Sequence, residues 1–243
     1  AVLPYEDKIL NVRWKSDKST VIFDRVAGGL AVDSIVNIEQ DALHTATIRS
    51  NLRYSWQTRK SNATIVFTNF NPALMAQHSD ALKSLAGADL PLKGTFSLTM
   101  DPDFKPGYGQ FALGAEPGKF SAAGLYAEPI PVHALYAQGK FNVPTGELAL
   151  EQLNADIGGP KITATGAVVQ QPAGHAITLS ATLQDMPLDK LKTYWPASLA
   201  ADARGWVTEH LSTGTATKAT LDLALLSPRA CAEACPGWQA FGP

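Results

Sequence analysis

The chain contains very little cysteine, and both cysteines lie close to its C-terminus. Cys231 and Cys235 are the only two among 243 residues. The long stretch before them therefore uses neither disulfide bonds nor thiolate metal ligands. A C-x-x-x-C pair without a nearby histidine or a second cysteine pair is a weak metal signal. We interpret this pair as incidental and predict no metal site.

Charged residues are also scarce. Asp, Glu, Lys and Arg make up 17% of the chain and give a net charge of −2, whereas an average soluble domain is roughly 25% charged. The longest basic run is Arg59-Lys60. Because binding to nucleic acid depends on neutralising phosphates with Lys and Arg, we predict that nucleic acid is not a partner.

Long apolar runs are missing as well. No stretch approaches the roughly 18 consecutive apolar residues that cross a bilayer. The chain begins at Ala1, without a basic segment followed by an apolar one. Because Lys8–Trp14 already has the pattern of a strand, we expect the numbering to begin after a signal or membrane anchor has been removed.

The familiar catalytic motifs are absent too. There is no G-x-S-x-G, no H-E-x-x-H and no Cys/His dyad. Asp101-Pro102-Asp103 is typical of a turn, and Gly114–Phe120 is interpreted as a hairpin turn because no Ser or Thr follows Lys119 as in a phosphate loop. The histidines are scattered, with no pair four residues apart: His44, His78, His133, His175 and His210. We predict no catalytic residue and no cofactor.

What the chain does contain is strict alternation of apolar and polar residues. In Thr95–Met100, Phe96 and Leu98 alternate with Ser and Thr. The same pattern recurs in Lys161–Val168, His175–Gln184 and Ala219–Leu225. Alternation predicts antiparallel strands with one apolar face and one wet face. Turn residues recur every 8–15 residues in several places, which predicts a meander of roughly twelve strands.

Proline marks one of these segments as peripheral. Pro129 and Pro131 flank Ile130, and proline cannot donate to a strand ladder. We therefore expect an edge strand or the start of a strand there.

A cassette of strand, short helices and strand occurs twice, at Phe67–Met100 and at Leu183–Leu225, about 116 positions apart. Each copy leaves a strand through Asn or Asp and a Pro. Each then returns to a strand through a Gly-Thr step, at Gly94-Thr95 and at Gly214-Thr215. A repeated unit of this kind predicts an elongated β structure.

The short helices of the two cassettes have recognisable starts. Asn71 is a preferred cap and Pro72 suits the first helical position. A second helix is expected to open at Ser79 or Asp80. In the later cassette a helix is expected to open at Ser198 or Ala200 and to end at Gly214.

The segment Tyr194–Thr215, YWPASLAADARGWVTEHLSTGT, resembles the AsmA-like bacterial envelope proteins, specifically their YhdP-type members. Asp89–Leu98, Leu125–Val132 and Gly146–Val169 also resemble that family, and the likeness covers roughly Ile9 to Leu225. The resemblance implies an anchor in the inner membrane, absent from this chain, and a periplasmic part built as a long curled sheet with an apolar groove. It further implies a role in moving phospholipid toward the outer membrane.

Two architectures remain open from the sequence. The first is a mainly β fold: an elongated, curled antiparallel sheet with an open groove over residues 1–226. Its helical cassettes lie near 71–87 and 186–213, and an irregular tail covers 227–243. The second is a closed β-sandwich, because the same alternation describes two sheets that bury their apolar faces against each other. A sandwich would favour a structural or protein-interaction module of the cell envelope.

An open sheet would place every second residue on a lane suited to acyl chains, where each buried methylene contributes ~0.8 kcal/mol. We predict that this lane is lined by Phe96, Leu98, Met100, Phe111, Leu113, Leu148, Leu150, Ile162, Leu179, Leu183, Leu221 and Leu223. The expected function is non-enzymatic lipid binding and transfer in the periplasm. The expected partners are phospholipid, the inner membrane and other envelope proteins. An enzyme would instead need a cluster of titratable residues at one end of the sheet.

Overall fold

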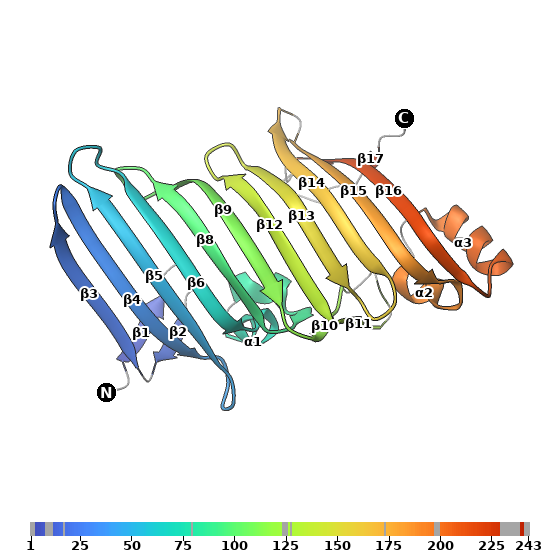
Figure 1. Cartoon of the computed structure of the whole chain (residues 1–243), viewed down its shortest axis with the longest axis horizontal. Helices are drawn as coiled ribbons and strands as arrows, with labels where there is room; N and C mark the ends of the chain where they lie inside the picture. Colours follow the sequence, from blue (N-terminus) through green and yellow to red (C-terminus); the bar gives the residue numbers. More distant parts are fainter. Residues whose placement is uncertain are drawn as a thin grey trace.

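One antiparallel sheet dominates the computed structural model, which describes residues 3–7, 12–16, 18–78, 80–122, 126, 128–172, 174–196, 200–228 and 239–240 (Figure 1). The sheet has twelve strands, and each is antiparallel to its neighbours. In spatial order they are β3 (Ser19–Val26), β4 (Gly29–Glu39), β5 (Thr45–Ser55), β6 (Ser61–Phe70), β8 (Leu92–Met100), β9 (Pro106–Ala115), β12 (Ala134–Asn142), β13 (Glu147–Asp156), β14 (Lys161–Gln171), β15 (Gly174–Pro187), β16 (Thr215–Pro228) and β17 (Gln239–Ala240).

The remaining elements lie in connections at one end of these strands, which we call the base. They are the strands β7 (Ala88–Asp89), β10 (Gly118–Phe120) and β11 (Ile130–Val132), the helices α1 (Pro72–Ala76), α2 (Leu191–Tyr194) and α3 (Ala201–His210), and the 3₁₀ turns η1 (Asp80–Leu85) and η2 (Leu188–Lys190). Before β3 the chain forms a separate hairpin of β1 (Leu3–Asp7) and β2 (Val12–Ser16). The opposite end, which we call the rim, carries the tight turns at 27–28, 56–60, 101–105 and 143–146.

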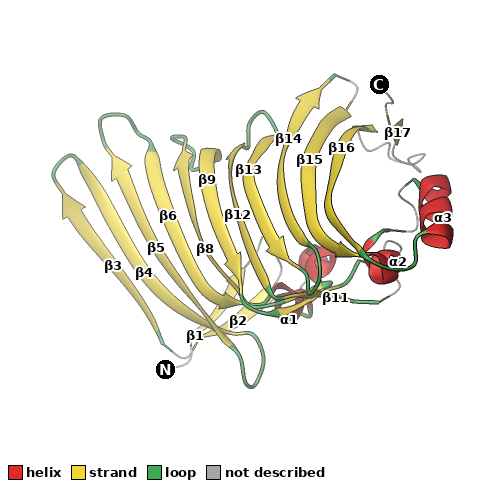
Figure 2. Cartoon of the chain, turned by 45° about the vertical axis from the view of Figure 1, so that its right-hand side comes forward, coloured by secondary structure: helices red, strands yellow, loops and turns green. Residues whose placement is uncertain are grey.

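Side chains from successive strands line up in rows, because directly paired residues of an antiparallel sheet point to the same face. The middle row crosses all eleven long strands: Val21, Ser34, Ser50, Ile65, Phe96, Phe111, Gly139, Leu150, Gly166, Leu179 and Leu223. This row belongs to the face on which the helices pack. The sheet curls toward that side, as Figure 2 shows for β14, β15 and β16, which bow so that α2 and α3 lie on the inner side of the curve. The apolar face is therefore concave.

Among the residues that the structure describes, the fully buried apolar clusters lie at the base. Met75 of α1 packs on Ile38 of β4, and Leu90 packs with Ala115 and Val132. A third cluster joins Leu191 and Tyr194 of α2 to Ile130 and Met186. The core therefore closes one long side of the concave face and leaves its centre uncovered.

The fold predicted from the alternation is confirmed, and the closed sandwich is wrong. Over the residues that the structure describes, the large sheet is neither closed on itself nor covered by a second sheet of comparable size. The edge position predicted around Ile130 is also confirmed, because β11 is an outer strand of the three-stranded sheet β11-β10-β7 in the described part of the chain.

Three local predictions are wrong. The helix expected to end at Gly214 ends at His210, and its C-cap is Leu211. Gly94 lies inside β8 instead of starting it. Its glycine serves a close approach within the sheet and not the entry to the strand, since a Cβ there would come 2.5 Å from the Ala112 carbonyl oxygen. Gly114–Phe120 is not a hairpin. β9 ends at Ala115, and β10 pairs with β7 and β11, where Gly118 approaches the Asp89 carbonyl too closely for any Cβ.

The cassettes otherwise follow the expected pattern. Asn71 accepts hydrogen bonds from the amides of Ala73 and Leu74, Asp80 begins η1, and Ala200 precedes α3. β16 begins directly after Gly214, whose φ is +106°. Ser79, Ser198, residues 8–11 and both cysteines lie outside the described residues. In the predicted tail, β16 continues to Pro228, and Gln239–Ala240 pairs with it.

None of the helices in the described part of the chain is both long and apolar enough to cross a membrane.

Candidate apolar binding face

All twelve residues predicted to line a lane lie on the concave face. Phe96, Phe111, Leu150, Leu179 and Leu223 occupy the middle row itself. The row next to it on the rim side contains Leu98 and Leu148, and the row on the base side contains Leu113 and Leu221. Met100 lies one step further toward the rim, and the paired residues Ile162 and Leu183 lie one step further toward the base. Eleven of the twelve are half-buried and Leu148 is exposed, so none is sealed in a core.

The middle row and its two neighbours contain no charged residue. The rim-side row reads Phe23, Val32, Leu52, Ala63, Leu98, Gly109, Phe141, Leu148, Val168, Ile177 and Leu225. The base-side row reads Ser19, Val36, Ile48, Phe67, Gly94, Leu113, Ala137, Leu153, Ala164, Ala181 and Leu221. Serine hydroxyls are the only polar side-chain groups in these three rows, and two of them satisfy each other: Ser34 and Ser50 are 2.7 Å apart.

Four phenylalanines form an aromatic cluster at the centre of this face. The ring of Phe96 lies 5.9 Å from that of Phe67, 6.2 Å from that of Phe111 and 6.4 Å from that of Phe141. These centroid separations fall in the favourable range for aromatic pairs. Phe67 is 8% exposed, whereas the other three rings are half-buried. The cluster spans β6, β8, β9 and β12 and forms the floor of the concave face.

Glycines lie beside three of these rings. Gly94 pairs with Phe67, Gly109 with Phe141, and Gly139 with Phe111. A Cβ at Gly94, Gly109 or Gly139 would come 3.0, 2.4 or 2.9 Å from an atom of the paired ring. Each phenylalanine can therefore lie against the neighbouring backbone instead of standing upright on the sheet. Because these positions have no side chain, the rings lie close to the sheet backbone and leave the concave face open above them.

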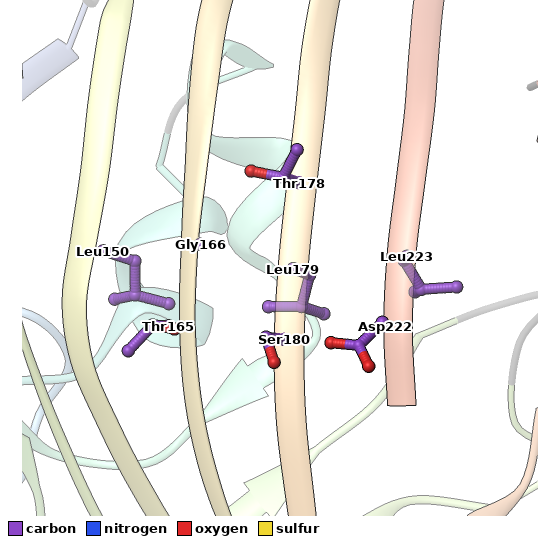
Figure 3. A pocket seen from close by; sticks show the side chains of 8 residues that line it. All are labelled: Leu150, Thr165, Gly166, Thr178, Leu179, Ser180, Asp222 and Leu223. Carbon is purple, nitrogen blue, oxygen red and sulfur yellow. The ribbon is translucent and has the colours of Figure 1, made fainter. Parts of the chain in front are cut away.

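Further along the middle row, Gly166 lies between Leu150 and Leu179. Here the sheet has a shallow hollow of about 360 Å³, and Figure 3 shows the residues that line it. The lining combines the leucines of the row with residues of the other face, among them Thr165 and Asp222. Because both faces contribute, this hollow marks a thin point of the sheet and does not by itself define a ligand site.

Hydrogen bonds fix the base beneath α1. Gln40 is 2% exposed. Its side-chain amide donates to the Asn69 carbonyl at 2.7 Å, and its side-chain oxygen accepts from the Asn71 amide at 2.6 Å. Its backbone carbonyl lies 2.7 Å from Nε2 of His78. This network holds the first helical cassette against the sheet end.

The second cassette is fixed mainly by Tyr194. Its hydroxyl donates to the Gly158 carbonyl at 3.2 Å. Burial, followed by the nearby charge of Asp156, raises the pKa of Tyr194 above its usual value. Arg204 of α3 adds hydrogen bonds to the carbonyls of Trp195 and Lys192. Both cassettes therefore close the base side of the apolar face.

The convex face carries most of the charged side chains of the sheet, together with a few exposed apolar residues, among them Ile22, Ile35 and Val66. Arg53 lies 3.3 Å from Asp33, and Lys140 forms an ion pair with Glu151, whose hydrogen bond raises the pKa of that lysine. Thr47 donates to Asn37 on the same side. The charges of the sheet are therefore kept off the apolar rows of the concave face, as alternation predicts.

The sequence prediction missed the first four strands of the lane and part of the cluster. Ile48, Ile65, Phe67 and Phe141 belong to the same rows as the predicted residues. The signal was partly present, because Ala63 and Ile65 alternate with Asn62 and Thr64 in β6, but Val66 breaks the alternation before Phe67.

The described residues include no group of three or more His, Cys, Asp and Glu arranged to hold a metal ion. Comparison of the chain with protein-family models, curated proteins and solved structures gives no match.

Proposed function

We propose that this chain is a non-enzymatic lipid-binding segment whose concave face carries the acyl chains of phospholipids. One observation carries the proposal: three adjacent rows cross eleven strands without a charged residue, and their large side chains remain partly exposed. Contiguous exposed apolar surface of this kind marks an interaction or ligand site. An uncharged lane also avoids the cost of desolvating a charge when an acyl chain lies on it.

The chemistry of the lane suits a hydrocarbon chain without fixed polar recognition. Each methylene taken out of water contributes ~0.8 kcal/mol, so the interaction energy is distributed along the chain and does not rest on a single residue. The phospholipid head group would remain outside the three rows. Binding of this kind needs no catalytic residue and no cofactor.

The cellular setting is part of the proposal and rests on the family resemblance. In that setting the segment lies in the periplasm, belongs to a protein anchored in the inner membrane, and carries phospholipid toward the outer membrane. The open apolar face supports the lipid-binding part of the proposal.

Native mass spectrometry tests lipid binding directly. The chain is purified in mild detergent, incubated with phosphatidylethanolamine and phosphatidylglycerol, and compared with Leu179→Asp and Ser180→Asp. These two residues are neighbours on β15 but face opposite sides of the sheet. We expect bound phospholipid on the wild type and on Ser180→Asp, and loss of at least half of it on Leu179→Asp. A wild-type chain that stays lipid-free would overturn the proposal.

A further inference from the structure

Exposed apolar residues occur in or beside four turns along the rim. Val26 is 41% exposed, Trp56 53%, Phe104 56% and Val143 50%. Neighbouring turns are joined by hydrogen bonds, since the Trp56 amide donates to the Gly28 carbonyl at 2.9 Å and the Val143 amide donates to the Gly107 carbonyl at 3.1 Å. The rim therefore presents a connected line of apolar side chains to its surroundings.

Two of these turns meet in an aromatic group that we call the rim aromatics: Tyr54, Trp56 and Phe104. The ring of Tyr54 lies 5.0 Å from Trp56, edge to face, and is stacked on Phe104 at 6.1 Å. Tyr54 pairs with Leu30 and Ser61, one step from the rim-side row of the concave face. The rim aromatics thus continue the apolar face as far as the turn tips.

Phe104 is held outward by its backbone. Its φ of +61° lies in the left-handed region, which is uncommon for any residue with a side chain and a genuine outlier for a bulky one. The turn is closed around Asp101, whose side chain accepts the amides of Asp103 and Lys105, and the Phe104 amide donates to the Asp101 carbonyl. Such strain concentrates where a side chain must be presented for function. Here it keeps an aromatic ring more than half exposed.

The turn backbones need few further hydrogen-bond partners. The Ser55 amide donates to Lys60, and the Arg59 amide donates to Ser55. In the neighbouring turn the Asp101 amide donates to Lys105. Turns with paired backbone groups can enter a less polar layer at lower cost than open strand edges can.

The residues around the rim aromatics match the composition of a membrane interface. Arg59, Lys60 and Lys105 are exposed beside Trp56 and Phe104, and they outnumber the two carboxylates of these turns, Asp101, which is engaged within its turn, and Asp103. Tryptophan and tyrosine prefer the level of lipid head groups, and long cationic side chains extend from that level into water.

We propose that the turns at 56–60 and 101–105 dock on the surface of a phospholipid bilayer and insert Trp56 and Phe104 into its interfacial layer. This inference goes beyond acyl-chain binding, because it assigns a membrane contact to the rim itself. Lipids would enter the concave face past Tyr54, along the side opposite the helical base.

Vesicle flotation and tryptophan quenching test this contact. The whole chain is mixed with phosphatidylcholine vesicles, with and without phosphatidylglycerol, and the bound fraction is measured for the wild type and for the Trp56→Ser/Phe104→Ser double variant. Trp206→Ser is the matched control, because Trp206 is 61% exposed on α3 at the base. We expect the double variant to lose about tenfold in vesicle affinity, a change of ~1.4 kcal/mol, and the control to keep wild-type affinity.

Vesicles that carry brominated acyl chains give a second readout that does not depend on stability. Quenching of fluorescence should weaken in Trp56→Phe and persist in Trp206→Phe. Wild-type protein that does not float with vesicles, or equal losses in the double variant and the control, would contradict rim docking. Leu179→Asp separates the two proposals, since it should lose bound phospholipid and still float with vesicles.

Discussion

The ring of Phe111 on β9 lies against Gly139 on β12, the residue directly paired with it. A Cβ at Gly139 would approach Cε1 of that ring to 2.9 Å and the Ala149 carbonyl oxygen to 2.1 Å. The close approach therefore depends on glycine. The same relationship at Gly94 and Gly109 makes it a repeated feature of the concave floor.

Gly139→Ala should accordingly destabilise the fold. The added methyl group forces the ring and a strand backbone apart, which typically costs ~1–3 kcal/mol. Gly205→Ala is the control, because a Cβ there meets nothing within 4 Å and the position lies inside α3. That variant should be stabilised by ~0.5–1 kcal/mol. Denaturant unfolding measures the free energy of unfolding of both variants. Equal changes in that free energy would show that the ring of Phe111 does not pack against Gly139.

Phe96 should be coupled energetically to Phe111. The two rings are 6.2 Å apart at the centre of the cluster, and aromatic pairs contribute ~0.5–1.5 kcal/mol beyond the area that they bury. A double-mutant cycle with Phe96→Ala and Phe111→Ala measures this coupling from unfolding free energies. Phe23→Ala, at a ring that is 68% exposed on the edge strand, should cost clearly less than either. A coupling indistinguishable from zero would argue against a packed cluster.

Gln40→Leu should loosen the base. The substitution leaves the Asn69 carbonyl and the Asn71 amide without their buried partner, and each unsatisfied group costs ~1–3 kcal/mol. Faster hydrogen exchange should then appear in α1 before it appears in the central strands. Gln184→Leu, at an exposed position on β15, should change stability by no more than ~0.5 kcal/mol. Unchanged exchange in α1 would count against this role of Gln40.

Tyr194→Phe should lower stability by ~1 kcal/mol, because the hydrogen bond to the Gly158 carbonyl is lost. It should also alter the pH dependence. Since the pKa of Tyr194 is raised on folding from its ordinary value of 10.0, its stabilisation is present below about pH 10 and is lost as the pH rises through the folded pKa. Thermal unfolding between about pH 8 and 11 should therefore fall less steeply for Tyr194→Phe than for the wild type. If the melting temperatures of the two proteins fell equally with pH, Tyr194 would not be the group responsible for this pH dependence.

Local patterns in the sequence predicted the character of the sheet well. The alternation around Phe96, Leu179 and Leu221 places all three on the concave face, because the period of a strand fixes which side chains share a face. The helix cap at Asn71 was likewise visible as a residue type with a specific backbone role, whereas α3 ends at His210, before the glycine that was expected to end it.

Long-range pairing could not be predicted in the same way. β6 pairs with β8 across an intervening helical cassette, and β9 pairs with β12 across the small sheet. Nothing local in Gly118–Phe120 distinguishes a hairpin strand from one that joins β7 and β11. The packing of the Phe67 ring against Gly94 also depends on which residues are paired across neighbouring strands. Local alternation does not contain that information.

The middle row also sets a length scale. Neighbouring strands lie ~4.8 Å apart, so a row that crosses eleven strands extends over ~48 Å along the curve of the sheet, which exceeds the ~30 Å hydrocarbon thickness of a bilayer. A hydrocarbon tail lying along the row would cover only part of it. Such a tail could shift by one strand at a time while the number of its contacts stayed nearly constant, and a second tail could follow in single file behind the first.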